Sequence, residues 1–261
     1  MDNVNCKGYI FLAIFSATYI LMLISPNAMA LEISPLTVEL KIDSKPNYQQ
    51  IIVRNNSNIS VPVEISINEI IFNPENVKPL FSLTSIEDSN DLLVFPPALI
   101  LEAGETKAIR VQWNGPKKIP QSKSYFIRFS QPQLSQPRSI SPEESGVKIF
   151  VHFNVVVHIS SMQLKENLSV LADTLTINKI QKKLTVSIKN NGNSYCYLKP
   201  NNLIKLNTTS NKKYFLDESI YSTLNDIFLP PHSIRNITIP VNSDWIEGDS
   251  LTINTENNND K

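Results

Sequence analysis

Cysteine is nearly absent from this chain. The 261 residues include two cysteines, and Cys6 lies in an N-terminal segment that we expect to be removed, which leaves Cys196. An exported protein with a single thiol forms no internal disulfide and depends on its hydrophobic core. A lone cysteine without a matched histidine is weak evidence for a nucleophile. Because Cys196 falls between two tyrosines of a predicted strand, we interpret it as a small, buried apolar residue.

Glycine and surplus charge are scarce as well. Six glycines leave little material for backbone phosphate cradles, and the chain has no Gly-Lys-Ser/Thr loop, Rossmann glycine pattern or Gly-x-Ser-x-Gly elbow. Basic and acidic residues balance at 24 each, without the basic excess of a general nucleic-acid binder. The sequence therefore favours neither a nucleotide-dependent enzyme nor a nucleic-acid partner.

Metal ligands and paired carboxylates are equally thin. His152 and His158 are six residues apart on a predicted strand, too far to share an ion, and we interpret them as solvated or packing side chains. Glu143 and Glu144 follow a proline in a predicted loop, which favours a solvated pair over an acid/base dyad. The sequence therefore predicts no catalytic residue, no metal and no cofactor.

Residues 1–30 have the layout of a cleaved export signal. Lys7 precedes an apolar run from Tyr9 to Ile24, and Ala28-Met29-Ala30 closes the segment with small residues. The run is shorter than the roughly 20 residues of a comfortable membrane span. We therefore expect a mature chain from Leu31 without a membrane segment; the alternative is an uncleaved N-terminal anchor.

The remaining sequence predicts an all-β protein of two immunoglobulin-like sandwiches. Apolar residues recur with period two, and glycine, proline and asparagine separate the short runs. Short strands at such spacing are typical of a sandwich. A change to shorter, asparagine-rich strands near residue 160 predicts domains at 31–160 and 161–261. The predicted strands are 31–34, 36–41, 48–54, 61–67, 109–113, 125–129, 147–159, 184–188, 195–198, 227–231 and 237–241.

The predicted strand 147–159 is unusually long. Its length would be about 43 Å at roughly 3.3 Å per residue, well above the usual five or six residues. Either the strand bends or its first half projects beyond its own sheet. An exposed edge with so many β-branched residues would be an aggregation hazard, whereas a long central strand buried on one face would not. The apolar residues of one parity are Val147, Ile149, Val151, Phe153, Val155 and Val157.

The order of these elements resembles the PapD-like periplasmic chaperones of pilus (fimbrial) assembly, which consist of two immunoglobulin-like domains. Each matching segment is loose, and the order and spacing carry the resemblance over nearly the whole mature chain. The matching segments are Leu31–Val38, Ile52–Asn58, Phe95–Ala98, Ala103–Glu105, Ile109–Val111, Tyr125–Phe129, the strand from Val147, Leu184–Val186, Asn190–Asn193 and Leu229–Ser233.

The resemblance implies a function for the long strand. Such chaperones are periplasmic and donate alternating apolar residues of this strand to a pilus subunit that lacks its own last strand, then deliver the subunit to an outer-membrane usher. The resemblance implies Val147, Ile149 and Val151 as donors, together with Phe153. In the free chaperone the strand would be protected by self-association, by the loop 131–146, or by a short lifetime.

One departure concerns the anchor for the subunit's terminal carboxylate. Family members use an arginine on the first strand and a lysine late in the long strand, and the matching positions here are Thr37 and Asn154. This pattern resembles a divergent branch such as the archaic chaperones. A buried carboxylate needs a cation or several donors, so we expect the pair Arg128 and Lys148, with Arg110 as a further candidate that an ion pair at the sheet edge would explain equally well.

Other functional classes fit less well. A secreted structural pilus or adhesin subunit would usually be one incomplete sandwich with a donor segment before it, whereas this chain starts directly with a strand. A carbohydrate-binding module would present a platform of exposed aromatic side chains, but Trp113 alternates onto an apparent core face and Trp245 stands alone. A hydrolase has no residue to carry its reaction. The sequence thus predicts an assembly chaperone without enzymatic activity.

Overall fold

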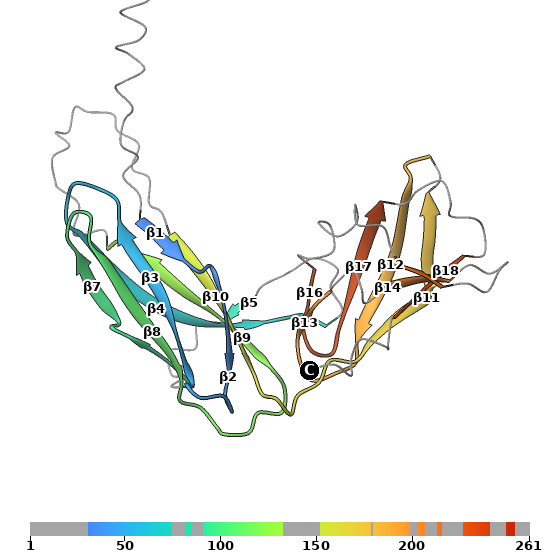
Figure 1. The fold of residues 1–261 in the computed structure, drawn as a ribbon, viewed down its shortest axis with the longest axis horizontal. Helices are drawn as coiled ribbons and strands as arrows, with labels where there is room; N and C mark the ends of the chain where they lie inside the picture. The colour runs from blue at the N-terminus through green and yellow to red at the C-terminus, as the bar shows by residue number, and fades with distance from the viewer. Residues whose placement is uncertain are drawn as a thin grey trace, which may run out of the picture.

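The chain folds entirely from β-strands in the part that the structure describes. The computed structural model describes residues 31–74, 82–84, 91–132, 152–178, 180–198, 203–206, 213–215, 227–240 and 249–253. These ranges contain no helix, and so none that could span a membrane. The predicted all-β class is confirmed, and Figure 1 shows two sandwiches joined near one end with an open angle between them.

The first sandwich consists of two facing sheets. One sheet has the order β1-β3-β8-β6, and in the other β2-β10-β9-β4 is extended by β5 and β7, which both pair with β4. The strand bounds are β1 Leu31–Ser34, β2 Thr37–Lys41, β3 Tyr48–Asn55, β4 Val61–Ile71, β5 Ser82–Thr84, β6 Leu92–Phe95, β7 Ala98–Leu101, β8 Thr106–Trp113, β9 Lys123–Ser130 and β10 His152–Ser160.

Period-two alternation explains the core between these sheets. In β9 the buried residues Tyr125, Ile127 and Phe129 alternate with Phe126 and Arg128, which are partly exposed on the other face. Successive side chains of a strand point to opposite faces, so each strand contributes every second residue to the core. Trp113 is buried, as the alternation of its strand predicts.

The second sandwich is smaller and has a separate hydrophobic core. Its sheets are β11-β12-β17, β13-β16 and β15-β14-β18. The bounds are β11 Leu168–Asn178, β12 Lys183–Asn190, β13 Cys196–Tyr197, β14 Leu203–Leu206, β15 Lys213–Phe215, β16 Phe228–Leu229, β17 Ser233–Pro240 and β18 Ser250–Ile253. Leu164 still packs into the first core, and the predicted boundary at residue 160 stays a prediction.

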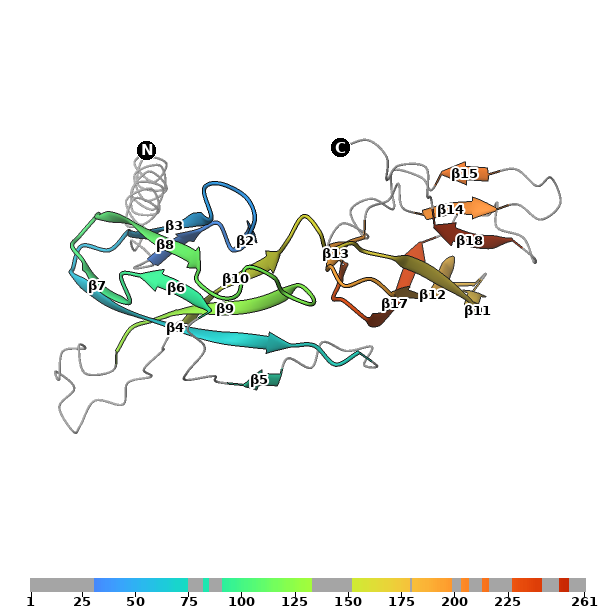
Figure 2. The same ribbon diagram turned by 90° about the horizontal axis from the view of Figure 1, so that it is seen from below.

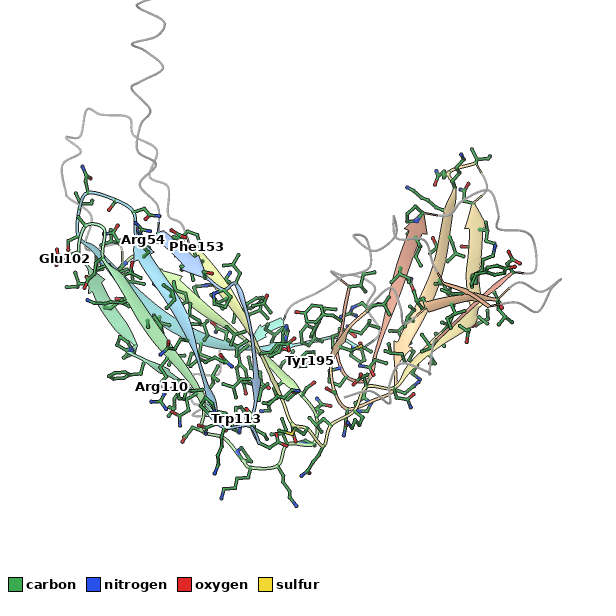
Figure 3. The ribbon with its side chains drawn as sticks, viewed as in Figure 1. Arg54, Glu102, Arg110, Trp113, Phe153 and Tyr195 are labelled. Atoms are coloured by element: carbon green, nitrogen blue, oxygen red, sulfur yellow. The ribbon has the colours of Figure 1, made fainter. Side chains whose placement is uncertain are left out.

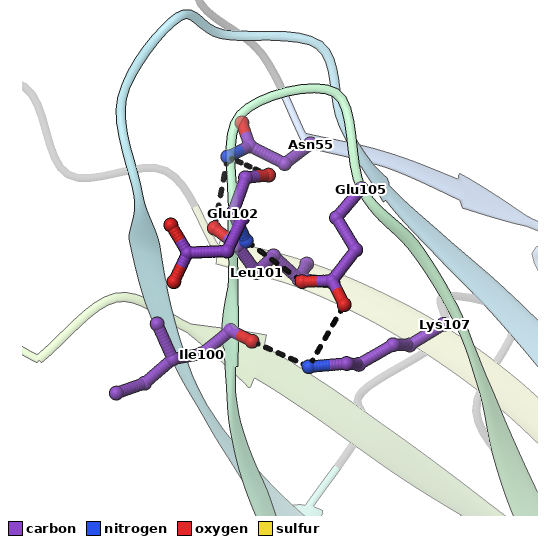
Figure 4. A network of polar contacts seen from close by, with 6 residues as sticks. All are labelled: Asn55, Ile100, Leu101, Glu102, Glu105 and Lys107. Carbon is purple, nitrogen blue, oxygen red and sulfur yellow. Dashed lines mark hydrogen bonds and ion pairs between the residues drawn. The ribbon is translucent and has the colours of Figure 1, made fainter.

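Each sandwich ties a turn to a neighbouring loop through one buried asparagine. In the first, Asn55 Nδ2 donates to the carbonyl oxygens of Leu101 and Glu102 at 3.0 Å each, and Figure 4 shows this contact beside the ion pair of Glu105 with Lys107. In the second, Asn190 Nδ2 donates to other carbonyl oxygens. Its acceptors are Ser194 (2.8 Å), Leu229 (3.4 Å) and Pro230 (3.0 Å). Backbone carbonyls that face the interior require such donors.

Candidate functional site

The strand β10 carries one apolar row that runs out of the sandwich core. Val155, Val157 and Ile159 are completely buried, whereas Phe153 is only half-buried at the edge of the same core. Figure 3 shows Phe153 at the end of β10 that is remote from the second sandwich. The row therefore leaves the core in the direction of residue 151. The predicted donors Val147, Ile149 and Val151 lie outside the described residues.

One edge of β10 is covered along only part of its length. The strand β9 pairs with β10 from His152 to Ile159, but β2 pairs with the opposite edge only from Val156 to Ser160. No strand of the described chain pairs with this edge between His152 and Val155. The open edge, as we call this stretch, offers unpaired backbone groups to an added strand.

The open edge exists because the first segment of the chain changes sheets. β1 pairs with β3 in the four-stranded sheet, and the chain crosses at Pro35 and Leu36 before β2 joins β10. The Val156 amide donates to the Leu36 carbonyl at 2.9 Å, which marks where coverage begins. Backbone groups of every second residue point to the same edge. The amides of Asn154 and His152 therefore face the uncovered side.

A polar pair lies on the outer face beside the open edge. Asn154 is paired with Arg128 across β10 and β9, and Arg128 Nε donates to Asn154 Oδ1 at 3.2 Å. Val156, the next residue of β10 after Asn154 on this outer face, is paired with Thr37. The structure thus brings the Arg128 guanidinium to Asn154, the position where the resemblance would have a lysine. Lys148 lies outside the described residues.

Arg110 is not part of this group. It lies on β8 in the four-stranded sheet, and its guanidinium carbon is 4.1 Å from the centroid of the Tyr48 ring, a cation–π contact. Figure 3 shows Arg110 on the side of the first sandwich that faces away from the second. The structure therefore separates Arg110 from Arg128, which the sequence could not establish.

The other end of the same sheet face is covered by the second sandwich. His158 is buried there, with Nδ1 2.8 Å from Ser124 Oγ and Nε2 2.9 Å from Tyr197 Oη. Its ring stacks on Phe228 at 4.5 Å between centroids, with Tyr195 at 4.7 Å. Burial lowers the pKa of His158 to about 4. The outer face of the β2-β10-β9 sheet therefore has the aromatic contact of His158 at one end and the open edge at the other.

His152, His158 and Cys196 form no reactive centre in the described part of the chain. His158 packs between rings, His152 is exposed, and the described residues include no group of three or more His, Cys, Asp or Glu side chains that could hold a metal. Cys196 packs against the second core, and burial raises the pKa of its thiol to about 12. Cys196 packs as a small apolar residue, as predicted, but it is partly rather than fully buried.

Among the comparisons with known proteins, the solved structures show the fold. Neither a scan against protein-family models nor a search of curated proteins gave a match. The crystal structure of the class 5 fimbriae chaperone CfaA superimposes with a TM-score of 0.51 at 20% identity, covering 86% of this chain and 98% of that chain. A chain from a study of a chaperone–tip adhesin complex in CFA/I fimbriae biogenesis gives 0.50 at 21% identity, covering 87% and 99%.

These similarities define the class of fold: the chain is built as the two-domain, immunoglobulin-like β-sandwich of fimbrial chaperones. The predicted resemblance to PapD-like chaperones is confirmed at the level of the fold. A complex from the archaic Csu pili of Acinetobacter baumannii gives a TM-score of 0.45 at 13% identity, covering 80% of this chain and 89% of that chain. The assignment to an archaic branch stays a prediction.

Proposed function

We propose that this chain is a periplasmic chaperone that binds, folds and caps pilus subunits by strand donation and delivers them to an outer-membrane usher. The observation that carries the proposal is the open edge of β10, which coincides with the end of an apolar row leaving the core. The chaperone has no enzymatic activity in this proposal, and the export signal of residues 1–30 directs it to the periplasm. Its first domain covers residues 31–160 and its second covers 161–261.

Strand addition uses both backbone and side chains of this region. The amides and carbonyls of the open edge extend the sheet of the first sandwich into the subunit, and side chains of one parity enter the subunit's groove. Val147, Ile149 and Val151 supply these side chains, and Phe153 lies where the row passes from groove to core. Each side chain that becomes buried contributes about 1.5–3 kcal/mol.

Arg128 is the described residue best suited to hold the subunit's terminal carboxylate. It lies beside the open edge, and its bond to Asn154 uses one of five guanidinium N–H donors. A guanidinium can bind a carboxylate through two parallel hydrogen bonds. Lys148 is the second member of the proposed pair, as the sequence predicts. Arg110 is excluded from the proposed pair because it lies in the opposite sheet over Tyr48.

Related structures support the class of partner. Two of the similar solved structures are described as a class 5 fimbriae chaperone and as part of a chaperone–tip adhesin complex. A pilin or tip adhesin is therefore the partner that we propose for this chain. The usher is proposed from the resemblance of the sequence.

Co-expression tests strand donation. The chain is produced with the subunit encoded beside its gene, and Val147, Ile149 and Val151 are changed to Asp. We expect a stable one-to-one complex with the wild type and none with the triple variant, whose own thermal unfolding should be unchanged. His152→Asp, an exposed position of the opposite parity, is the control and should retain the complex. Equal binding by the triple variant would refute donation.

A second experiment tests the anchor. Arg128→Gln should weaken subunit binding by at least tenfold, since a charge-assisted hydrogen bond contributes about 1.5–3 kcal/mol, and Arg128→Lys should restore part of the affinity. Arg54→Gln removes an exposed arginine from β3 in the other sheet and should have no effect. Equal losses for Arg128→Gln and Arg54→Gln would show that only net charge matters.

A further inference from the structure

The connection between the two sandwiches is attached to both of them. Its first half is bound to the first sandwich, where Asp43 accepts from the Ser161 hydroxyl at 2.9 Å and Leu164 enters the core. Its second half is bound to the other sandwich, where the Lys165 amide donates to Asn193 Oδ1 at 2.9 Å. The attachment changes between Leu164 and Lys165. A change of angle between the sandwiches would turn about this peptide. It would also strain three hydrogen bonds between the sandwiches: Ser122 amide to Asn193 carbonyl (2.9 Å), Tyr195 amide to Ser122 Oγ (2.8 Å) and Ile234 amide to Pro74 carbonyl (3.1 Å).

An aromatic cluster lies close to this turning point. Three rings of the second sandwich contact His158: Tyr195, Tyr197 and Phe228. Phe72 of the first sandwich extends the cluster, with its ring centroid 5.3 Å from that of Phe228. Figure 2 shows the end of β4 reaching across to the second sandwich, where Phe72 follows the strand. The rings bury apolar surface against one imidazole, so the contact depends on an uncharged side chain.

We propose that His158 is the pivot that holds the two sandwiches at one fixed angle, and that acid releases this angle by charging the imidazole. This inference does not rest on the proposed function. Ser124 of the first sandwich and Tyr197 of the second bond to the two ring nitrogens, so one side chain joins both units. In the neutral imidazole one nitrogen donates and the other accepts, and a hydroxyl satisfies either role.

The surroundings give the charged imidazole little compensation. Stacking on Phe228 provides a cation–π contact, but the loss of hydration outweighs it and lowers the pKa of His158. Glu39 pairs with His158 across β2 and β10 and is the acid that faces the cluster. The neighbouring strands of the first sandwich also carry titratable groups: Lys41 on β2, His152 on β10, Lys123, Tyr125 and Arg128 on β9, and Glu64 and Glu69 on β4. Tyr195, Cys196 and Tyr197 lie on the segment of the second sandwich that contacts His158, and Lys165 and Glu166 lie on the connection.

These neighbours fix the direction of the pH effect. Lys123 is bound to Glu69 at 3.4 Å and to Asp91 at 3.3 Å. Tyr195 and Tyr197 stay neutral because burial raises the pKa of both phenols. A histidine with a depressed pKa favours the docked state fully above its free value of 6.5, and this contribution is lost as the pH falls towards 4. The docked-to-open ratio should fall by up to about tenfold per pH unit, and by about thirtyfold at pH 5.

Energy transfer between two dyes measures the angle directly. The dyes are attached through Thr106→Cys on β8 and Lys183→Cys on β12, both exposed, in a Cys196→Ala background of the chain from Leu31. We expect one narrow distance distribution at pH 7.5 and a broad one at pH 5, with the emission of buried Trp113 unchanged. An unchanged distribution at pH 5 would overturn the proposal.

Four variants separate the pivot from general acid effects. His158→Phe keeps a ring without a titrating group and should not respond to pH, while His152→Phe on the same strand should behave as the wild type. Glu39→Gln removes the facing carboxylate and should move the opening to higher pH. His158→Lys should be open at pH 7.5 while both sandwiches remain folded. An acid response that survives in His158→Phe, or a docked His158→Lys, would contradict the assignment.

Discussion

The buried asparagine of the first sandwich allows a quantitative test of how this fold is stabilised. Asn55 is 1% exposed and makes five side-chain hydrogen bonds. Its amide nitrogen donates to the carbonyls of Ile59, Leu101 and Glu102, and its oxygen accepts from the amide and the hydroxyl of Ser57. Asn55→Ala removes all five bonds and keeps the backbone bond from Asn55 to Glu105. The strand therefore stays paired while the turn loses its link to the loop after β7.

The size of the effect follows from which partners water can reach. The carbonyls of Ile59 and Glu102 are partly accessible, so water replaces those bonds at little cost. The Leu101 carbonyl and the Ser57 amide are buried. A buried polar group without a partner costs about 1–3 kcal/mol. Two such groups give a loss of about 3 kcal/mol in the free energy of unfolding of the first sandwich, or about 2 M in urea midpoint at a slope of about 1.5 kcal/mol per molar.

Urea unfolding followed by tryptophan fluorescence measures this loss. Trp113 reports on the first sandwich, and Trp245→Phe removes the other tryptophan. The matched control is Asn56→Ala, an exposed neighbour that donates to Glu32 Oε2 at 3.0 Å and should shift stability by less than about 0.5 kcal/mol. A loss below about 1 kcal/mol for Asn55→Ala, or one equal to that of the control, would refute the reasoning.

Three further predictions concern the second sandwich. Cys196 should resist thiol reagents at pH 8 in the native state and react in urea; because its pKa is raised from 9.0 to about 12, folding stability should decrease above pH 9, as a pH titration of urea midpoints would show. Gly192→Ala would force a Cβ against the Lys165 carbonyl oxygen and should cost at least about 2 kcal/mol by thermal unfolding. Thr174→Val removes the hydroxyl that accepts from the Ser187 amide at 2.8 Å and should cost about 1–2 kcal/mol in urea, whereas an unchanged midpoint would mean that water replaces it.

Strands with strict alternation were predictable, and an irregular strand was not. The runs around Val63, Ile109 and Ile127 alternate without interruption, and each forms a strand in the structure. The segment Leu168–Asn178 was missed because its pairing with β12 shifts register between Leu171 and Thr176. Over this stretch β11 advances five residues while β12 advances two, an excess of three. Because the excess is odd, the parity reverses and the period-two signal cancels within one strand.

Some features of the candidate site were likewise predictable from the sequence, and others were not. An apolar row along one strand is a local property, and the sequence predicts it together with its unusual length. The pairing of Arg128 with Asn154 depends on the register between β9 and β10, and the contact of His158 with Tyr197 depends on how two domains meet. Such contacts join residues far apart in the sequence, and no local pattern encodes them. The aromatic spacing of Tyr195 and Tyr197 around Cys196 was the one available signal, and it indicated a strand rather than an interface.

The change of sheet between β1 and β2 sets a length as well as a topology. The point at which the chain crosses, after Ser34, determines how many residues of β10 remain uncovered. Slipping β2 by two residues along β10 towards His152 would keep every side chain on its face while shortening the open edge by two. Slipping it by one would turn the apolar residues of β2 outward. The chain can therefore adjust the number of positions available to an added strand only in steps of two, through a segment that is distant from that strand in the sequence.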